Sequence, residues 1–94
     1  RSEPPSILEI CEELHISRRT LHYGFIKVLG INPVTFLRYL RLNGARRELI
    51  TADPALTTVS DIAARWGFWH VGMFCTYYKE LFGEVPARTL RLKK

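Results

Sequence analysis

Two related stretches decide the fold: residues 7–33, ILEICEELHISRRTLHYGFIKVLGINP, and residues 59–86, VSDIAARWGFWHVGMFCTYYKELFGEVP. Apolar residues, a glycine and a proline recur in the same order in both. The two copies lie 52 positions apart before an internal turn (Ile7 to Val59) and 53 positions apart after it (Phe25 to Tyr78). Each copy has the pattern of a short helix, a tight turn and a second helix. This pattern is typical of the helix-turn-helix, whose second helix enters the major groove of DNA.

Helix-capping residues set the boundaries of the predicted elements. Ser6 and Ser17 are N-cap candidates for helices over residues 7–14 and 18–29, and Gly30 ends the second helix. An Asn-Pro pair then begins a long helix that we expect to reach about residue 50. The predicted fold is all-α, with two helix-turn-helix subdomains joined by that long helix. Its parts are the end of a linker at 1–5, a first helix-turn-helix at 6–31, a linker helix at 32–52 and a second helix-turn-helix at 57–94.

Composition favours a polyanionic partner and excludes other classes of protein. The 94 residues carry a net charge of +5, and 47% of them are hydrophobic, which is enough for a compact core. No apolar run is long enough to span a bilayer, so no membrane partner is expected. His15, His22 and His70 lack zinc-type spacing, and no nucleophile–base set or phosphate-binding glycine loop occurs. We therefore expect neither an enzyme, nor a cofactor, nor a metal site.

The first unit offers a polar face on its second predicted helix. With Leu21 pointing to the core, Phe25 and Val28 lie near the same direction at 100° per residue. Arg19 and Tyr23 then lie on the far side. The flanks carry His22, Ile26 and Lys27. Arginine suits guanine edges, and lysine suits phosphate.

The corresponding helix of the second unit has fewer base-reading groups. We expect Phe74, Tyr78 and Leu81 to face its core, which leaves Gly72, Thr76 and Lys79 outward and Val71, Met73 and Cys75 near its start or flank. The first unit should therefore supply most direct readout, and the second should add phosphate contacts and apolar contacts with thymine methyl groups. Trp69 and His70, which lengthen the second turn, are interpreted as packing locally in that turn.

The sequence resembles the DNA-binding domain of the AraC/XylS family of bacterial transcription regulators. The resemblance rests on residues 17–21, 30–33, 59–68 and 78–86, and it covers residues 6 to 91. It implies seven helices, a recognition helix from each unit in successive major-groove segments, and an effector-binding or dimerisation domain elsewhere in the protein. It also implies activation through RNA polymerase. The runs at 66–70 and 46–49 are similar to a subgroup that includes the ethanolamine-utilisation regulator.

Two sets of candidate DNA contacts follow from the outward faces and the resemblance. The base-reading candidates are Arg19, His22, Tyr23, Val71, Gly72, Met73 and Thr76. The phosphate candidates are Ser17, Arg18, Lys27, Arg46, Thr58 and Lys79. The family often has a polar residue at the position of Gly72 and an arginine at that of Thr76, so the second helix departs from the family pattern.

The partner predicted from these residues is double-stranded DNA, and the predicted function is sequence-specific binding by a transcription regulator. Cys11 and Cys75 are expected to be free thiols in a reducing cytosol, which gives a cytoplasmic location. The alternative is a protein-interaction module in which Val71, Met73 and Trp69 dock a helix of another protein, with vestigial DNA affinity.

Overall fold

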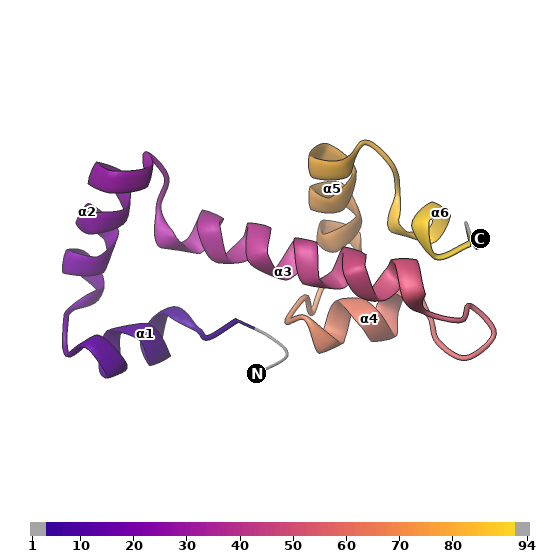
Figure 1. Cartoon of the computed structure of the whole chain (residues 1–94), viewed down its shortest axis with the longest axis horizontal. Coiled ribbons are helices and arrows are strands. Elements are labelled where there is room, and N and C mark those ends of the chain that lie inside the picture. Colours follow the sequence, from indigo (N-terminus) through magenta and orange to yellow (C-terminus); the bar gives the residue numbers. More distant parts are fainter. Residues whose placement is uncertain (1–3, 92–94) are drawn as a thin grey trace. The chain divides into compact units, whose positions relative to one another are not determined.

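The computed structural model describes residues 4–91, which form six helices and no strand. The predicted all-α class is confirmed, and the helix count is close to the seven that the resemblance implies. Residues 1–3 of the expected linker end lie outside the described residues. The helices are α1 (Ile7–Leu14), α2 (Arg18–Leu29), α3 (Pro33–Thr51), α4 (Val59–Arg65), α5 (Val71–Phe82) and α6 (Pro86–Arg91) (Figure 1).

The helices begin at the predicted caps. Ser6 and Glu9 form a reciprocal capping box at the start of α1, and the Ser17 side chain accepts a hydrogen bond from the Thr20 backbone at the start of α2. Between these helices His15 has a left-handed backbone with φ 56°. Each short loop therefore ends one helix and begins the next through local hydrogen bonds that the sequence specifies.

The chain divides into two compact units within α3, the first ending at Leu40 and the second beginning at Arg41. The helix expected as a linker is thus shared between the units. In the first unit, the buried apolar side chains include Cys11 of α1, Leu21 of α2 and Leu37 of α3. The rings of Phe25 and Phe36 also pack together at 5.5 Å between centroids. This small core fixes α2 against its neighbours.

An expected core residue of the first unit is exposed. The Val28 side chain near the end of α2 is 79% exposed, and Leu14 at the end of α1 is also exposed. Helical spacing placed Val28 on the core side, but no element among the described residues covers it there. Spacing predicts the direction of a side chain, whereas burial also requires a second element opposite it.

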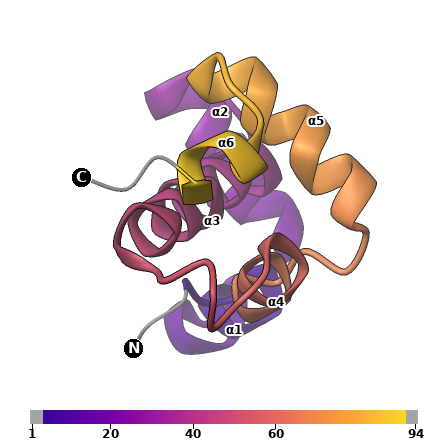
Figure 2. The same ribbon diagram turned by 90° about the vertical axis from the view of Figure 1, so that its right-hand side faces the viewer.

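The second unit has the larger core. In Figure 2, α4, α5 and α6 surround the C-terminal part of α3. Each helix places side chains in the same cluster, and these are Leu42, Ala45, Leu49, Ile62, Ala63, Phe74, Tyr78 and Leu90. On α5 the prediction for Leu81 was wrong. This residue is 41% exposed, and Phe82 packs on the cluster instead, with its ring 4.7 Å from that of Tyr78.

A glycine and a carboxylate hold α4 against α3. Gly44 is buried, and a methyl group in its place would overlap the six-membered ring of Trp66. The Trp66 indole N–H donates to Glu48 Oε1 at 2.8 Å, and the Arg65 guanidinium donates to the other oxygen of the same carboxylate. The indole therefore fills a notch that exists because residue 44 has no side chain.

A buried hydrogen-bond chain joins α5 to α6. The Tyr78 hydroxyl donates to Thr89 Oγ1 at 2.8 Å, and that hydroxyl donates to the Glu84 carboxylate. Burial raises the pKa of Tyr78 above its ordinary value of 10.0, against the opposing effects of the Thr89 hydrogen bond and the Arg46 charge. The phenol is therefore neutral and able to donate.

No helix among residues 4–91 is long and apolar enough to cross a membrane. Within the same residues, no group of three or more histidine, cysteine, aspartate or glutamate side chains could hold a metal ion.

Substituting Gly44 should destabilise the second unit. We expect Gly44→Ala to lower the free energy of unfolding by about 1–3 kcal/mol, because the new methyl group must displace the Trp66 ring. Gly24→Ala is the matched control, since a methyl group there meets nothing within 4 Å. That change should raise stability by about 0.5–1 kcal/mol, as alanine favours a helix. Urea unfolding followed by circular dichroism measures both. If the two substitutions changed the free energy of unfolding equally, the Trp66 ring would not depend on the missing side chain at residue 44.

The Glu48 carboxylate should make stability depend on acid. Burial opposes its ionisation, but the hydrogen bonds from Arg65 and Trp66 and the Arg65 charge outweigh burial and hold the Glu48 pKa below its ordinary value of 4.5. A lowered folded-state pKa stabilises the fold above the unfolded-state value, and this contribution disappears as the pH falls through the folded-state value.

Thermal unfolding between neutral pH and the acid limb below pH 4.5 tests this expectation. Glu48→Gln should lose less stability on acidification than the wild type does. Glu80→Gln, which changes an exposed carboxylate of α5, should keep the wild-type dependence. A Glu48→Gln curve parallel to that of the wild type would show that the ionised carboxylate does not stabilise the fold.

Candidate nucleic-acid interface

The second helix of the first unit presents a cationic and aromatic surface. Leu21 is buried and fixes the rotation of α2, so that Arg19, His22 and Tyr23 are all exposed. The Arg19 guanidinium lies 5.5 Å from the centroid of the Tyr23 ring, and the rings of His22 and Tyr23 meet edge to face at 6.0 Å. These three side chains, here named the α2 cluster, form a surface that projects away from the core.

The contacts within the α2 cluster restrict the arginine. A guanidinium over an aromatic face is attracted by the ring quadrupole, which favours one side-chain arrangement without using any of its N–H donors. Arg19 therefore keeps its planar set of donors for an external acceptor. Such a fork matches both the O6/N7 edge of guanine and the phosphate group.

The other candidates on α2 lie around this cluster. Arg18 and Lys27 are exposed, one at the start of the helix and one in its last turn. The Ser17 hydroxyl accepts from the Thr20 backbone and donates to Thr20 Oγ1 at 3.0 Å. Its donor is thus already used in the cap, while Arg18 and Lys27 are exposed and stay predicted phosphate contacts.

The outward face of α5 is uncharged near its start. Phe74 and Tyr78 are fully buried and fix the rotation of the helix, which leaves Gly72, Met73 and Thr76 exposed. The Thr76 hydroxyl donates to the Gly72 carbonyl at 3.1 Å, one turn earlier in the same helix. Its only proton is therefore used within the helix, and a base can approach it only as a donor or through its methyl group.

The interpretation of Trp69 as packed in the turn was wrong. Its side chain is 82% exposed, and His70 is also exposed and makes no side-chain hydrogen bond to the start of α5. Phe68, rather than Trp69, supplies the turn with its apolar anchor, since its ring lies 4.9 Å from that of Phe74. One aromatic residue thus fills the core side of the turn, and the described residues leave Trp69 largely uncovered.

Two phosphate candidates of the second unit make contacts within the protein. One exposed carboxylate on α5 was also not considered in the sequence analysis. The Arg46 guanidinium lies 5.1 Å from the centroid of the Phe82 ring, and the Thr58 side chain caps α4 by accepting from the Asp61 backbone. Lys79 is exposed on α5. Glu80, next to it, is exposed as well and lies on the outward side of the helix, where sequence reasoning did not weigh a negative charge.

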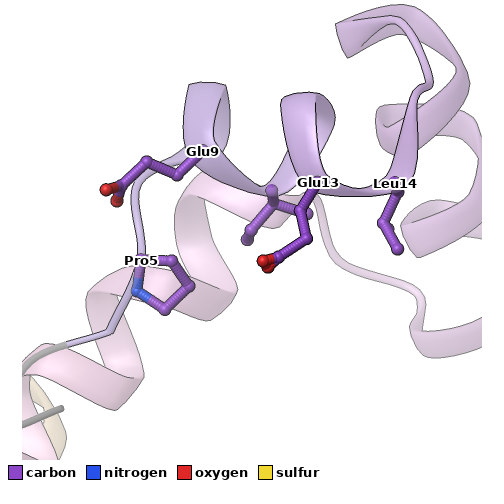
Figure 3. Close-up of a pocket in the computed structure, with 5 residues that line it drawn as sticks. Pro5, Glu9, Glu13 and Leu14 are labelled. Carbon is purple, nitrogen blue, oxygen red and sulfur yellow. The ribbon is translucent and has the colours of Figure 1, made fainter.

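A shallow pocket of the first unit lies on α1 and does not suit DNA. Pro5 from the preceding segment and Glu9, Ile10, Glu13 and Leu14 from α1 line it (Figure 3). Two carboxylates at one opening repel a phosphate backbone. Within the first unit, the exposed face of α2 carries the cations Arg18, Arg19 and Lys27 and is the surface with the charge to suit a polyanion.

Comparison with known proteins places this geometry in a family. A family model described as a helix-turn-helix domain matches residues 10–92. The crystal structure of a probable AraC family transcriptional regulator from Rhodopseudomonas palustris has 33% identity and a TM-score of 0.83, covering 97% of this chain and 84% of that one. This chain belongs to the AraC family of helix-turn-helix domains. Its type is the DNA-binding domain of transcription regulators.

Two further matches extend the comparison. The probable thc operon regulatory protein of Rhodococcus erythropolis is 40% identical over 89 residues, which cover 95% of this chain and 27% of that protein. The DNA-binding domain of AdpA, solved in complex with a target DNA, has 26% identity and a TM-score of 0.76, and the match covers 93% of this AraC-family chain and 76% of that one. The chain thus spans about a quarter of the length of this curated relative. The ethanolamine subgroup stays a prediction.

Proposed function

We propose that this domain binds a specific double-stranded DNA site by placing α2 and α5 in two successive major-groove segments, about one helical turn or ~34 Å apart. The observation that carries the proposal is the α2 cluster, an arginine held over a tyrosine on the exposed face of a capped helix. The net charge of +5 and the family membership support it.

The residues of α2 have separate roles in this proposal. Arg19 contacts a guanine edge, with His22 and Tyr23 beside it on neighbouring base edges. Arg18 and Lys27 contact phosphates on the two sides of the groove and set the position of the helix. Ser17 acts through its cap, which directs the first backbone N–H groups of α2 toward the backbone of the DNA.

The second unit adds contacts of another kind. Lys79 and the start of α5 meet the DNA backbone, and Val71, Gly72, Met73 and Thr76 face the bases. We keep Arg46 and Thr58 as phosphate contacts through the groups that their internal partners leave available: the remaining guanidinium donors of Arg46 and the Thr58 hydroxyl proton.

The whole regulator extends beyond this domain in our proposal. A further domain that binds an effector or dimerises would accompany it, in line with the longer relative. The protein would act in the cytoplasm, where bacterial DNA lies, and would activate transcription by contacting RNA polymerase. This domain would contribute no catalysis, no metal and no cofactor.

A second function remains as the alternative. The exposed Trp69, together with Val71 and Met73, forms apolar surface of the kind that docks a helix of another protein. In that case DNA affinity would be vestigial.

Selection from randomised duplex DNA, followed by titration of the selected site at several salt concentrations, tests the proposal. We expect an asymmetric site that spans two major-groove segments, with affinity that falls steeply as salt rises, because each phosphate contact releases counterions. Alanine at Lys27 should reduce the slope of log K against log salt by about one. No enriched site and a flat salt dependence would favour the protein-docking alternative.

Two substitutions of Arg19 separate base recognition from charge. Arg19→Ala should weaken binding to the selected site by about 1–3 kcal/mol and relax the preference at one base pair. Arg19→Lys keeps the charge but loses the planar fork, so it should lose the same base preference while keeping the salt slope. Quantitative binding to the selected site and to single-base variants measures both. If Arg19→Ala weakened binding to the selected site and to random DNA equally, Arg19 would be a phosphate contact.

A further inference from the structure

The two recognition helices differ in chemistry at equivalent positions. Shifted by the 53-residue period, six positions that are exposed on both α2 and α5 can be compared one by one. On α2 they are Arg18, Arg19, Thr20, Tyr23, Ile26 and Lys27, which include three cations. On α5 they are Val71, Gly72, Met73, Thr76, Lys79 and Glu80, which include one cation and one carboxylate. The first half of α5 thus offers the DNA only apolar groups and one hydroxyl.

Gly72 has no structural reason to be a glycine. It lies inside α5, its φ is not among the positive values of the described backbone, and a methyl group added there meets nothing within 4 Å. A glycine within a helix is unfavourable relative to alanine. Because Gly72 lies on the side of α5 opposite the buried Phe74, its missing side chain leaves the outward surface of the helix open to close approach by another molecule.

Apolar groups surround this point of approach. Met73 is 48% exposed, and Val71 is also exposed. The Thr76 hydroxyl is turned back to the Gly72 carbonyl, so the outward part of that side chain is its methyl group. Among the four bases, only thymine presents an apolar group in the major groove, its C5-methyl.

We propose that α5 recognises thymine through this methyl group, with Gly72 as the point of closest approach and Met73 and Thr76 packing against it. The inference rests on the proposed function and adds a base preference to it. The two half-sites are then read by different chemistry, with hydrogen bonds from the α2 cluster in one and methyl contacts from α5 in the other.

Replacing thymine by deoxyuridine in the selected site tests the proposal directly, because this change removes the methyl group and keeps every hydrogen-bonding group. The α5 half-site is the one whose base preference Arg19→Ala leaves unchanged. There we expect each contacted methyl to contribute about fourfold in affinity, as for one buried methylene. Deoxyuridine in the α2 half-site is the control and should change affinity little.

Matched substitutions of Thr76 assign the contact to a side chain. Thr76→Ser keeps the hydroxyl and removes only the methyl group, so it should weaken binding to the thymine site and reduce the effect of deoxyuridine. Thr76→Val keeps the methyl group and should retain the preference for thymine. If Thr76→Ser left both the affinity and the deoxyuridine effect unchanged, Thr76 would not contact the methyl.

Gly72→Ala separates folding from recognition. Its Tm should stay the same or rise, whereas affinity for the selected site should fall by about tenfold through the loss of one good contact. Gly24→Ala is the control: its position is equally open, but it lies about 60° from the direction of the buried Leu21, whereas Gly72 lies about 160° from the direction of the buried Phe74. This variant should bind normally.

The outcomes separate failure of the thymine proposal from failure of the proposed DNA recognition. A selected two-part site whose thymines can all be replaced by deoxyuridine without loss, and which Gly72→Ala binds normally, would overturn the thymine proposal and leave DNA recognition intact. A two-part site without thymine in the α5 half would do the same. Absence of any selected site would overturn the proposed function itself.

Discussion

The packing of the Trp66 indole against Gly44 is the contact on which the second helix-turn-helix depends. Trp66 ends α4, and the next residue, Gly67, has φ 85°, a left-handed backbone that turns the chain toward α5. The Glu48 carboxylate holds the indole N–H and the neighbouring Arg65 at once. Because the end of α4 is anchored on α3, the turn and the start of α5 are also fixed.

The helix-turn-helix therefore occurs twice in this chain, and a different set of packing contacts holds the second helix in each copy. In the second unit, eight buried side chains from α3, α4, α5 and α6 hold the recognition helix. In the first unit, among the described residues, α2 depends on the smaller core around Leu21 and on its Ser17 cap. A helix-turn-helix needs only enough packing to fix the rotation of its second helix, and one buried leucine with a cap does so for α2.

The division of chemistry between the helices follows from this arrangement. The α2 cluster gains its order from the contact of Arg19 with Tyr23, on the surface itself. On α5 the buried side chains of Phe74 and Tyr78 fix the orientation of the helix, and its exposed surface carries few polar groups. A helix so firmly held can place small apolar groups against bases, where a poorly placed methyl group would contribute little. The exposed Trp69 marks the place where this apolar surface continues beyond the helix.

The sequence by itself determined the helices and their ends, because caps such as Ser6 and Ser17 and the left-handed residue His15 act through hydrogen bonds and dihedral preferences within a few residues. It also determined the outward direction of Arg19 and Tyr23, which follows from helical period. Only the tertiary structure decided which apolar residues are buried. Val28 and Leu81 have the spacing of core residues, but no element among the described residues covers them. In the second turn Phe68, and not Trp69, packs against the core. Burial depends on what lies opposite a side chain, and that information is distributed over residues far apart in the chain.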